Sequence, residues 1–183
     1  MKIFLILLFV LFQSCENSGE EKESEAEETS IRISGIAIDG YLSGSNVELL
    51  GETTVTDENG TWELYFPISE KENLKESFVT IKNGIDTATG EEYEGVIRVP
   101  VTSWYSATVG TPITTIISAM MNEDKNSSSA YSDFSCLSGI PVETLYLDHM
   151  EMIQDGDPET RKTGIKIVKT ALVIQKSLKY LSK

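Results

Sequence analysis

The pattern of apolar residues changes near Thr111, and this change limits the possible folds more than any other feature of the chain. Before it, apolar and polar residues alternate in short runs, as in half-buried strands. The clearest run is 61–66, in which one face is formed by Trp62, Leu64 and Phe66. After Thr111, apolar residues recur at helical spacing. The sequence therefore predicts an α+β fold, with a small antiparallel β-sandwich at residues 31–110 and a helical section packed on it at residues 111–183.

Turn signals divide the first part into about six strands. Besides 61–66, β-type runs occupy residues 31–38, 46–50, 53–56, 77–81 and 96–101. The sequence Asp-Glu-Asn-Gly at residues 57–60 predicts a tight turn, because Asn and Gly tolerate left-handed backbone conformations. Gly35 interrupts the first run and predicts a kink or a bulge there.

A capping side chain followed by proline marks two helix starts, at Thr111-Pro112 and at Asp157-Pro158. The first helix carries apolar residues at helical spacing, namely Ile113, Ile116, Ile117 and Met120. We expect a polar loop at 122–129, a helix at 141–153, and a long terminal helix that ends near Leu181.

The terminal helix has two faces of different character. Its apolar stripe consists of Ile167, Ala171, Ile174, Leu178 and Leu181. The opposite side gathers Lys162, Lys166, Lys169, Lys176 and Lys183. Two interpretations remain open: the stripe packs on the rest of the protein and leaves the lysines solvated, or the helix lies on an anionic membrane. The first is favoured because the sheets need a cover.

The chain opens with Lys2 and ten unbroken apolar residues, 3–12. As a helix, ten residues reach only about 15 Å, half of a hydrocarbon core of about 30 Å. This length is typical of the apolar region of a signal peptide, which we place at residues 1–14.

Ser14, a small residue, stands directly before Cys15. This arrangement resembles the lipobox of bacterial lipoproteins, although Phe12 and Gln13 stand where that family prefers Leu and a small residue. The resemblance implies a diacylglyceryl lipid on Cys15, cleavage before it, and a membrane partner bound through the lipid. An ordinary secretory signal with a chance cysteine is the alternative.

Residues 16–28 contain seven Glu and one Lys, and the only apolar residue in 16–30 is Ala26. Such a segment cannot bury enough surface to fold, so we expect residues 15–30 to form an acidic disordered tether behind the lipid. In the lipoprotein sorting pattern, Glu16 in place of Asp implies the outer membrane rather than the inner one, with the protein facing the periplasm or the cell surface. The net charge of −14 argues against a nucleic-acid partner.

Several motifs follow one another in the middle of the chain, at residues 33–35, 39–47, 56–62, 84–90 and 109–115. The segment 39–44 reads Asp-Gly-Tyr-Leu-Ser-Gly, and 109–115 reads Val-Gly-Thr-Pro-Ile-Thr-Thr. In this order they resemble a carboxypeptidase-regulatory-like, or prealbumin-like, β-sandwich module of bacterial envelope proteins. The resemblance implies a non-catalytic module for adhesion, spacing or ligand binding.

Candidate catalytic and metal residues are few. Cys136 and His149 make a conceivable pair, but no nucleophile motif surrounds the cysteine. We expect Cys136 to be a small buried residue and His149 to lie at the surface or half-buried. Zinc needs three or four N or S ligands, which the chain does not offer once Cys15 carries lipid. We therefore expect no catalytic residues, no metal and no cofactor.

Oxygen ligands for calcium occur at residues 57–60 and 155–157, but neither segment has EF-hand spacing. We expect these residues to form a turn and a helix cap. Aromatic residues that could form a sugar platform are expected to be mostly core, and they are Tyr41, Trp62, Tyr65, Tyr93, Trp104 and Tyr105.

The sequence thus predicts a lipid-anchored cell-envelope lipoprotein that acts as a non-catalytic binding or structural module, with an unidentified protein or glycan ligand. Two alternatives are an accessory carbohydrate-active or hydrolytic lipoprotein, which needs a cleft with two carboxylates about 5–10 Å apart, and a subunit of an envelope complex, which needs an exposed apolar patch.

Overall fold

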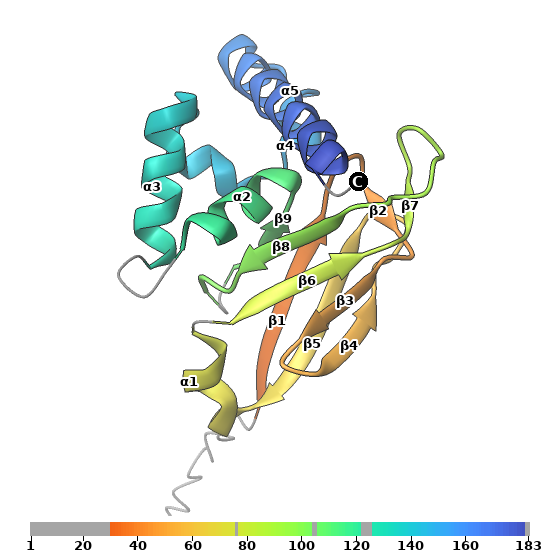
Figure 1. The fold of residues 1–183 in the computed structure, drawn as a ribbon, viewed down its shortest axis with the longest axis vertical. Coiled ribbons are helices and arrows are strands. Elements are labelled where there is room, and N and C mark those ends of the chain that lie inside the picture. The colour runs from red at the N-terminus through yellow and green to blue at the C-terminus, as the bar shows by residue number, and fades with distance from the viewer. Residues whose placement is uncertain (1–29, 76, 104–105, 122–125, 182–183) are drawn as a thin grey trace, which may run out of the picture.

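A computed structural model of the chain describes residues 30–75, 77–103, 106–121 and 126–181 (Figure 1). All strands lie before residue 111, and, apart from one short turn of helix, the α-helices lie after it. The expected α+β class is confirmed. The expected signal peptide, Cys15 and the acidic segment fall outside the described residues.

A three-stranded sheet has the first strand at its centre. β1 (Ser30–Ala37) lies between β5 (Thr61–Pro67), which is antiparallel to it, and β9 (Thr108–Gly110), which is parallel to it. The expectation of purely antiparallel pairing is therefore wrong at β9. The chain reaches β9 from the other sheet rather than through a hairpin, so β9 can run in the same direction as β1.

Gly35 does not form the kink or bulge that we expected. β1 pairs with β5 in unbroken register from Ser30 opposite Pro67 to Ile36 opposite Thr61. A Cβ atom at Gly35 would lie 2.3 Å from the Thr108 carbonyl oxygen and 2.5 Å from the Trp62 ring. Glycine is required because the indole and strand β9 occupy the space of a side chain.

A four-stranded antiparallel sheet has the order β4-β3-β6-β8. Its strands are β4 (Glu52–Val55), β3 (Asn46–Leu49), β6 (Phe78–Lys82) and β8 (Val96–Pro100). Each lies within one or two residues of its expected range. A short pair, β2 (Leu42–Ser43) and β7 (Ile85–Asp86), stands beside the sheets. A 3-10 turn (Ile68–Glu70) and α1 (Lys71–Leu74), which the sequence did not predict, connect β5 to β6.

The inward-facing side chains of the two larger sheets meet in one apolar cluster. The three-stranded sheet contributes Ile31, Ile33, Trp62, Leu64 and Phe66, and the four-stranded sheet contributes Val47, Leu49, Val79, Ile81, Ile97 and Val99. The alternation that predicted residues 61–66 is confirmed, since every second residue of β5 is buried.

The turn at residues 57–60 is confirmed. Gly60 has φ +75° and its backbone N–H donates to the Asp57 carbonyl oxygen at 3.0 Å. The Asp57 carboxylate accepts from the backbone N–H groups of Asn59 and Thr61 at 2.9 and 2.8 Å. This carboxylate therefore holds the turn, as expected, and faces its own backbone.

The first expected helix is confirmed as α2 (Pro112–Met120). The Thr111 hydroxyl accepts from the Thr114 backbone N–H, and the Thr114 hydroxyl accepts in return from the Thr111 N–H. Ile113 and Ile117 are buried on its inner face. The reciprocal cap fixes the point where the chain leaves the sheets.

The expected polar loop at residues 122–129 ends too late, because α3 (Ser127–Ser138) begins inside it. The Asn126 side chain caps this helix by accepting from the Ser129 N–H at 3.0 Å. Gly139 ends it with φ +61°. The helix has a weak apolar pattern, with three buried residues, Ala130, Tyr131 and Phe134, so its periodicity did not reveal it.

The single helix expected at residues 141–153 is also wrong. The chain forms a 3-10 helix (Val142–Tyr146) and then α4 (His149–Met152). Leu147 and Asp148 between them are extended, and the Asp148 carboxylate accepts from the Met150 N–H at 2.8 Å as the cap of α4. A capping aspartate inside an apolar run thus divides the segment in two.

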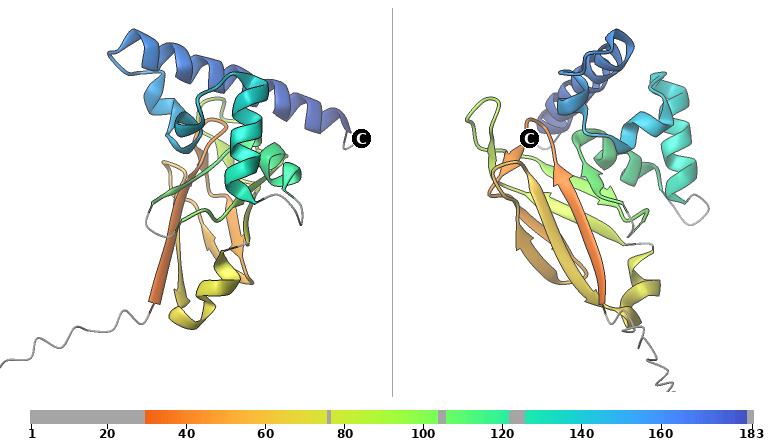
Figure 2. Two further views of the ribbon diagram at one scale, coloured as in Figure 1. Left: turned by 90° about the vertical axis from the view of Figure 1, so that its left-hand side faces the viewer. Right: turned by 180° about the vertical axis from the view of Figure 1, so that it is seen from behind.

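The terminal helix is confirmed as α5 (Pro158–Leu181), capped by the Asp157 carboxylate, which accepts from the Thr160 N–H at 2.8 Å. Ile167 and Ala171 of its stripe are buried and Ile174 is partly buried. They join α2, α3 and α4 in a second apolar cluster, so the stripe packs on the protein as the favoured interpretation expected. Figure 2 shows α5 lying across the end of the sheets, far from the start of β1. None of the helices in the described ranges is long and apolar enough to cross a bilayer.

Candidate functional site

The loop after β1 is the most polar junction between the sheets and the helices. Gly40 lies in it, where a Cβ atom would stand 2.0 Å from Asp86 Oδ1 of β7, so only glycine permits this approach. Asp39 Oδ2 accepts a hydrogen bond from Gln175 Nε2 of α5. The loop therefore joins β1, β7 and the terminal helix at one place.

The carboxyl group of Asp39 is unusual for its surroundings. Its Oδ1 atom is buried and has no hydrogen-bond partner in the described part of the chain. Burial, and after it the nearby charge of Asp86, raises its pKa to about 6. Burial also raises the pKa of the neighbouring Tyr93 hydroxyl. Near neutral pH, Asp39 therefore exchanges a proton that ordinary aspartates lose at lower pH.

A second link runs from the same loop to α4. The Tyr41 hydroxyl donates to Asp148 Oδ2 at 2.9 Å, while the other oxygen of Asp148 caps α4. Burial, followed by this hydrogen bond, raises the pKa of Tyr41 to about 12. Lys179 of α5 adds an ion pair with Glu94, with 2.6 Å between Nζ and Oε2. These contacts fasten the helices to the sheets.

Cys136 and His149 have the opposite burial from the one expected. Cys136 is exposed on α3, because the apolar face of that helix runs through Tyr131 and Phe134 instead. His149 is buried at 1% exposure, because it sits at the first turn of α4 where that helix packs on α5. An exposed thiol and a buried imidazole do not form a nucleophile and its base.

The imidazole of His149 is kept neutral by its environment. Burial lowers its pKa to about 4, against an opposing effect of the Asp148 carboxylate. Its Nε2 atom has no hydrogen-bond partner among the described residues. The sequence offered no signal for this burial beyond the apolar neighbours of His149.

The oxygen-rich segments serve the turn and the cap that we expected. Asp57 holds its own turn, and Asp157 caps α5. Within the described ranges, no three His, Cys, Asp or Glu side chains are grouped so that they could hold a metal ion.

The aromatic residues do not form one platform. Trp62 and Tyr93 are buried, as expected of core residues, whereas Tyr65 is exposed and Tyr41 is half-buried against Asp148. Trp104 and Tyr105 fall outside the described residues.

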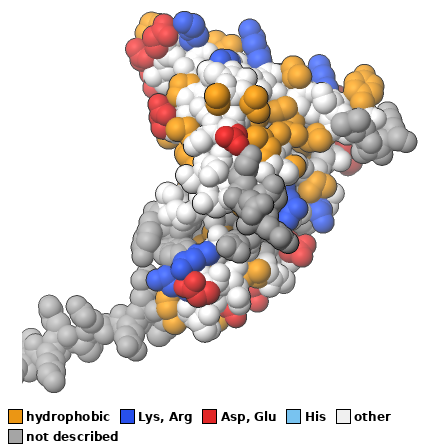
Figure 3. Space-filling model, turned by 60° about the vertical axis from the view of Figure 1, so that its left-hand side comes forward, with side chains coloured by type: hydrophobic (Ala, Val, Ile, Leu, Met, Phe, Trp, Pro, Cys, Tyr) orange, Lys and Arg blue, Asp and Glu red, His pale blue; other side chains and the backbone are white. Residues whose placement is uncertain are grey.

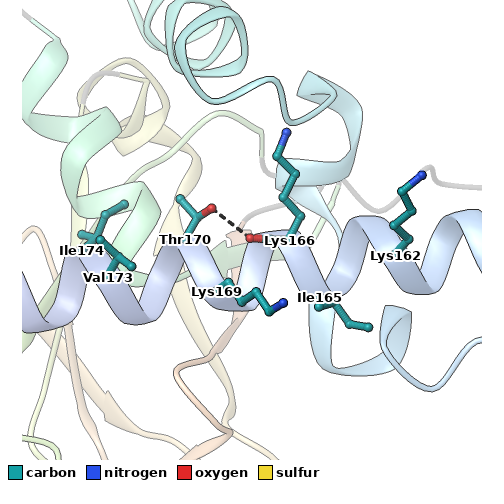
Figure 4. Close-up of a pocket in the computed structure, with 7 residues that line it drawn as sticks. All are labelled: Lys162, Ile165, Lys166, Lys169, Thr170, Val173 and Ile174. Carbon is teal, nitrogen blue, oxygen red and sulfur yellow. Dashed lines mark hydrogen bonds between the residues drawn. The ribbon is translucent and has the colours of Figure 1, made fainter.

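Two shallow hollows lie elsewhere on the surface. One runs along α5 (Figure 4) and is lined by Lys162, Ile165, Lys166, Lys169, Thr170, Val173 and Ile174. The other lies beside the outer face of the three-stranded sheet and is lined mainly by Arg32, Ser34, Gly35, Ile36, Thr61, Trp62 and Glu63. Neither contains Asp39, Cys136 or His149.

Sequence reasoning missed the junction of Asp39, Asp86, Asp148 and Gln175. The segment Asp39-Gly40-Tyr41 was part of the resemblance, but nothing in the sequence tied it to residues more than a hundred positions away. Comparison with protein-family models, with curated proteins and with solved structures finds no match for this chain.

Proposed function

We propose that this protein is a lipid-anchored lipoprotein of the bacterial cell envelope that acts as a non-catalytic binding or structural module. The observation that carries the proposal is the start of the chain: ten apolar residues, then Ser14-Cys15, then an acidic segment, all before β1 begins at Ser30. The lipid on Cys15 holds the protein on the outer membrane, facing the periplasm or the cell surface.

The position of β1 suits a long tether. Fifteen residues, 15–29, reach roughly 50 Å when extended. The stretch from Ser30 to Asp39 spans about 30 Å as a strand. A tether that exceeds the length of the sheets lets the folded part turn either of its ends toward the bilayer.

We propose further that the strand region is a β-sandwich of the prealbumin-like kind. Two sheets whose inner faces share one apolar cluster support this arrangement. The turn at residues 57–60 and the helix start at Thr111-Pro112 also support it, because both motifs belong to the resemblance.

The hollow on the three-stranded sheet is our proposed contact surface for a protein or glycan ligand. Arg32 and Glu63, which form an ion pair at 2.8 Å, line it together with Ser34. Trp62 also lines this hollow, and its Nε1 atom is buried without a hydrogen-bond partner in the described part of the chain. A shallow surface lined by both polar and apolar side chains fits an extended ligand better than a small enclosed molecule.

The hydrolytic alternative has one observation in its favour, the raised pKa of Asp39 beside Asp86. Both side chains are already engaged, however. Asp39 accepts from Gln175, and Asp86 accepts from the Ala88 N–H and the Thr89 hydroxyl. Their contacts fit a structural junction better than an acid and a base, and we retain the binding module.

The anchor is tested by Cys15→Ser, with Cys136→Ser as the matched control because it removes the other thiol. We expect Cys15→Ser to abolish labelling by a fatty-acid analogue and to release the protein from membranes after signal cleavage. Cys136→Ser should be labelled and retained like the parent. Membrane retention of the cleaved Cys15→Ser protein would contradict the anchor.

The binding surface is tested separately by Ser34→Tyr, which fills the hollow while leaving the core unchanged. We expect molecules that co-purify with the detergent-extracted parent to be lost from Ser34→Tyr and kept by Glu48→Tyr, a change at an exposed position of β3. Equal retention by both variants would move the ligand surface elsewhere.

A further inference from the structure

The outward face of α5 is both apolar and basic. Its apolar residues Ile165, Leu172, Val173 and Tyr180 are 40%, 40%, 66% and 80% exposed. At about 100° per residue they fall within an arc of roughly 100° that also contains Lys169 and Lys176. We call these six residues the outer face of α5; it lies opposite the buried stripe of Ile167 and Ala171. A helix packed on one side only needs no apolar residues on the other, so this face calls for an occupant.

The charges on this face are all of one sign. From residue 160 to the end, the chain has seven Lys or Arg and no Asp or Glu. Lys162 pairs with Glu159, and Lys166 donates to the Gly139 carbonyl oxygen, but Lys169 and Lys176 form no ion pair within the described part of the chain. Figure 3 shows basic and apolar side chains alternating along the upper edge of the molecule, where α5 lies.

We propose that the outer face of α5 docks on an anionic lipid surface. The apolar side chains enter the boundary between headgroups and acyl chains, and the lysines reach the phosphates beside them. Each lysine near such a surface contributes about 1 kcal/mol, or a factor of about five in binding. Because acids dominate the rest of the chain, the field of the whole protein turns α5 toward the lipid and the sheets away from it.

Two other occupants fit this face less well. A second copy of the chain would place Lys169 and Lys176 against their own equivalents, which repel each other. The acidic residues 16–28 have the right charge, but their one apolar side chain, Ala26, would leave Leu172, Val173 and Tyr180 uncovered. Of these three occupants, the lipid surface alone satisfies both the apolar and the basic side chains.

The proposed anchor and the outer face of α5 can reach the same bilayer. Asp39, at the far end of β1 from Ser30, is hydrogen-bonded to Gln175 of α5. The tether of roughly 50 Å therefore exceeds the distance of about 30 Å along β1 and leaves length to pass α5. Docking of α5 does not depend on the lipid attached to Cys15, so the anchor and the docking surface can be tested separately.

The test uses the unlipidated chain from residue 15 with Cys15→Ser, which keeps every residue of both apolar clusters. Its sedimentation is measured with vesicles of phosphatidylcholine, with and without phosphatidylglycerol as the anionic lipid. We expect binding only to the anionic vesicles, weakening as salt is added because the lysines are exposed. No binding of this parent to anionic vesicles would overturn the proposal.

Two matched double variants locate the contact. Lys169→Gln with Lys176→Gln should weaken binding about 25-fold, two factors of five. Lys75→Gln with Lys82→Gln changes the net charge equally, just after α1 and in β6, and should change binding less than about twofold, because neither lysine lies on α5. Tyr180→Ser should also weaken binding, and an equal loss in both lysine pairs would overturn the assignment to α5.

The other occupants give distinct results in the same experiment. If the chain from Ser30 binds vesicles and the chain from residue 15 does not, the acidic segment occupies the face. A stable dimer in solution that Tyr180→Ser dissociates would assign the face to a second copy. Either result would overturn docking on lipid.

Discussion

The strand region and the helical section of this protein are built in different ways. In the strand region, two sheets close on one apolar cluster, and side chains alternate in and out along each long strand. In the helical section, five helical segments of very different length gather around a smaller cluster. Much of the strongly exposed apolar surface also lies there, including Leu137 and Tyr180 at about 80% exposure.

The two regions differ in how strictly packing fixes the role of each residue. A sheet with one buried face fixes the role of every residue, because a shift by one position would exchange inside and outside. A helix at the edge of a protein needs only one stripe for packing, and its other face is free to serve binding. In α5 the buried stripe and the exposed apolar residues lie on opposite sides of the same helix.

The largest effect is expected in the sheet core. Ile81, fully buried in β6, belongs to the first cluster. Ile81→Ala should lower the free energy of unfolding by about 4 kcal/mol, because it leaves a cavity as well as losing burial. Chemical denaturation measures this. Ile85→Ala, at an exposed position of β7, is the matched control and should stay within about 0.5 kcal/mol.

The same truncation in the helical cluster should cost somewhat less. Ile167→Ala removes a buried contact of α5 and should lower the free energy of unfolding by about 3 kcal/mol, because α5 packs at the edge of the protein. The control is Ile165→Ala on the outer face, expected within about 0.5 kcal/mol. Equal effects of the two changes would mean that the outer face is packed as well, against the contrast drawn above.

Asp39, beside the sheets, and His149, in the helical section, should have opposite effects on how the stability of the fold depends on pH. The pKa of Asp39 is raised from 3.8 to about 6, so the folded state holds its proton longer and stability falls as pH rises through this window. The pKa of His149 is lowered from 6.5 to about 4, so the unfolded state holds the proton longer and stability rises with pH. The two slopes oppose each other and should nearly cancel in the parent.

Single variants should reveal each slope. Asp39→Asn removes the falling slope, so the free energy of unfolding should rise by about 2 kcal/mol between pH 4 and 6.5. His149→Gln removes the rising slope, so the free energy of unfolding should fall by about 1–2 kcal/mol over the same range. This second change is the smaller one because solvent partly screens Asp39. Unfolding titrations at several pH values measure both. Identical pH profiles for the parent and both variants would show that neither group is buried as described.

The smallest expected effect concerns two glycines. Gly60 and Gly44 have almost the same conformation, with φ +75° and +72°, but a Cβ atom at Gly60 would lie 2.6 Å from the Ala37 carbonyl oxygen, whereas Gly44 has open space. Both changes to alanine should cost about 1 kcal/mol for the left-handed backbone. Gly60→Ala should cost about 1 kcal/mol more for the clash. Equal melting temperatures for the two variants would contradict the close approach of this turn to β1.

The strand region could be predicted well because its signals are local. Alternation located residues 61–66 and the Asp-Glu-Asn-Gly turn located their start. What failed there depended on distant residues: Gly35 makes room for Trp62 and β9, and the parallel pairing of β9 comes from the return of the chain. No local pattern encodes either contact.

The helical section was predicted at its two capped starts and missed between them. α3 has a polar, serine-rich beginning, and only three of its residues are buried, so its apolar period is faint. The segment 141–153 has enough apolar residues for a helix, but Asp148 caps a new one inside it. Because of these two errors, the burial of His149 and the exposure of Cys136 were not predicted. Asp39 could not be recognised, because its partner Gln175 lies at the other end of the chain.

The central place of β1 has a consequence for how the chain is made. The first strand to leave the ribosome is flanked by β5 and by β9, and the latter ends at Gly110. Pairing partners that distant in sequence close slowly, because the intervening loop loses entropy before any contact forms. The sheet around β1 thus stays incomplete until most of the polypeptide has emerged. For a protein that we propose is exported, this delay keeps the nascent chain unfolded while it is translocated.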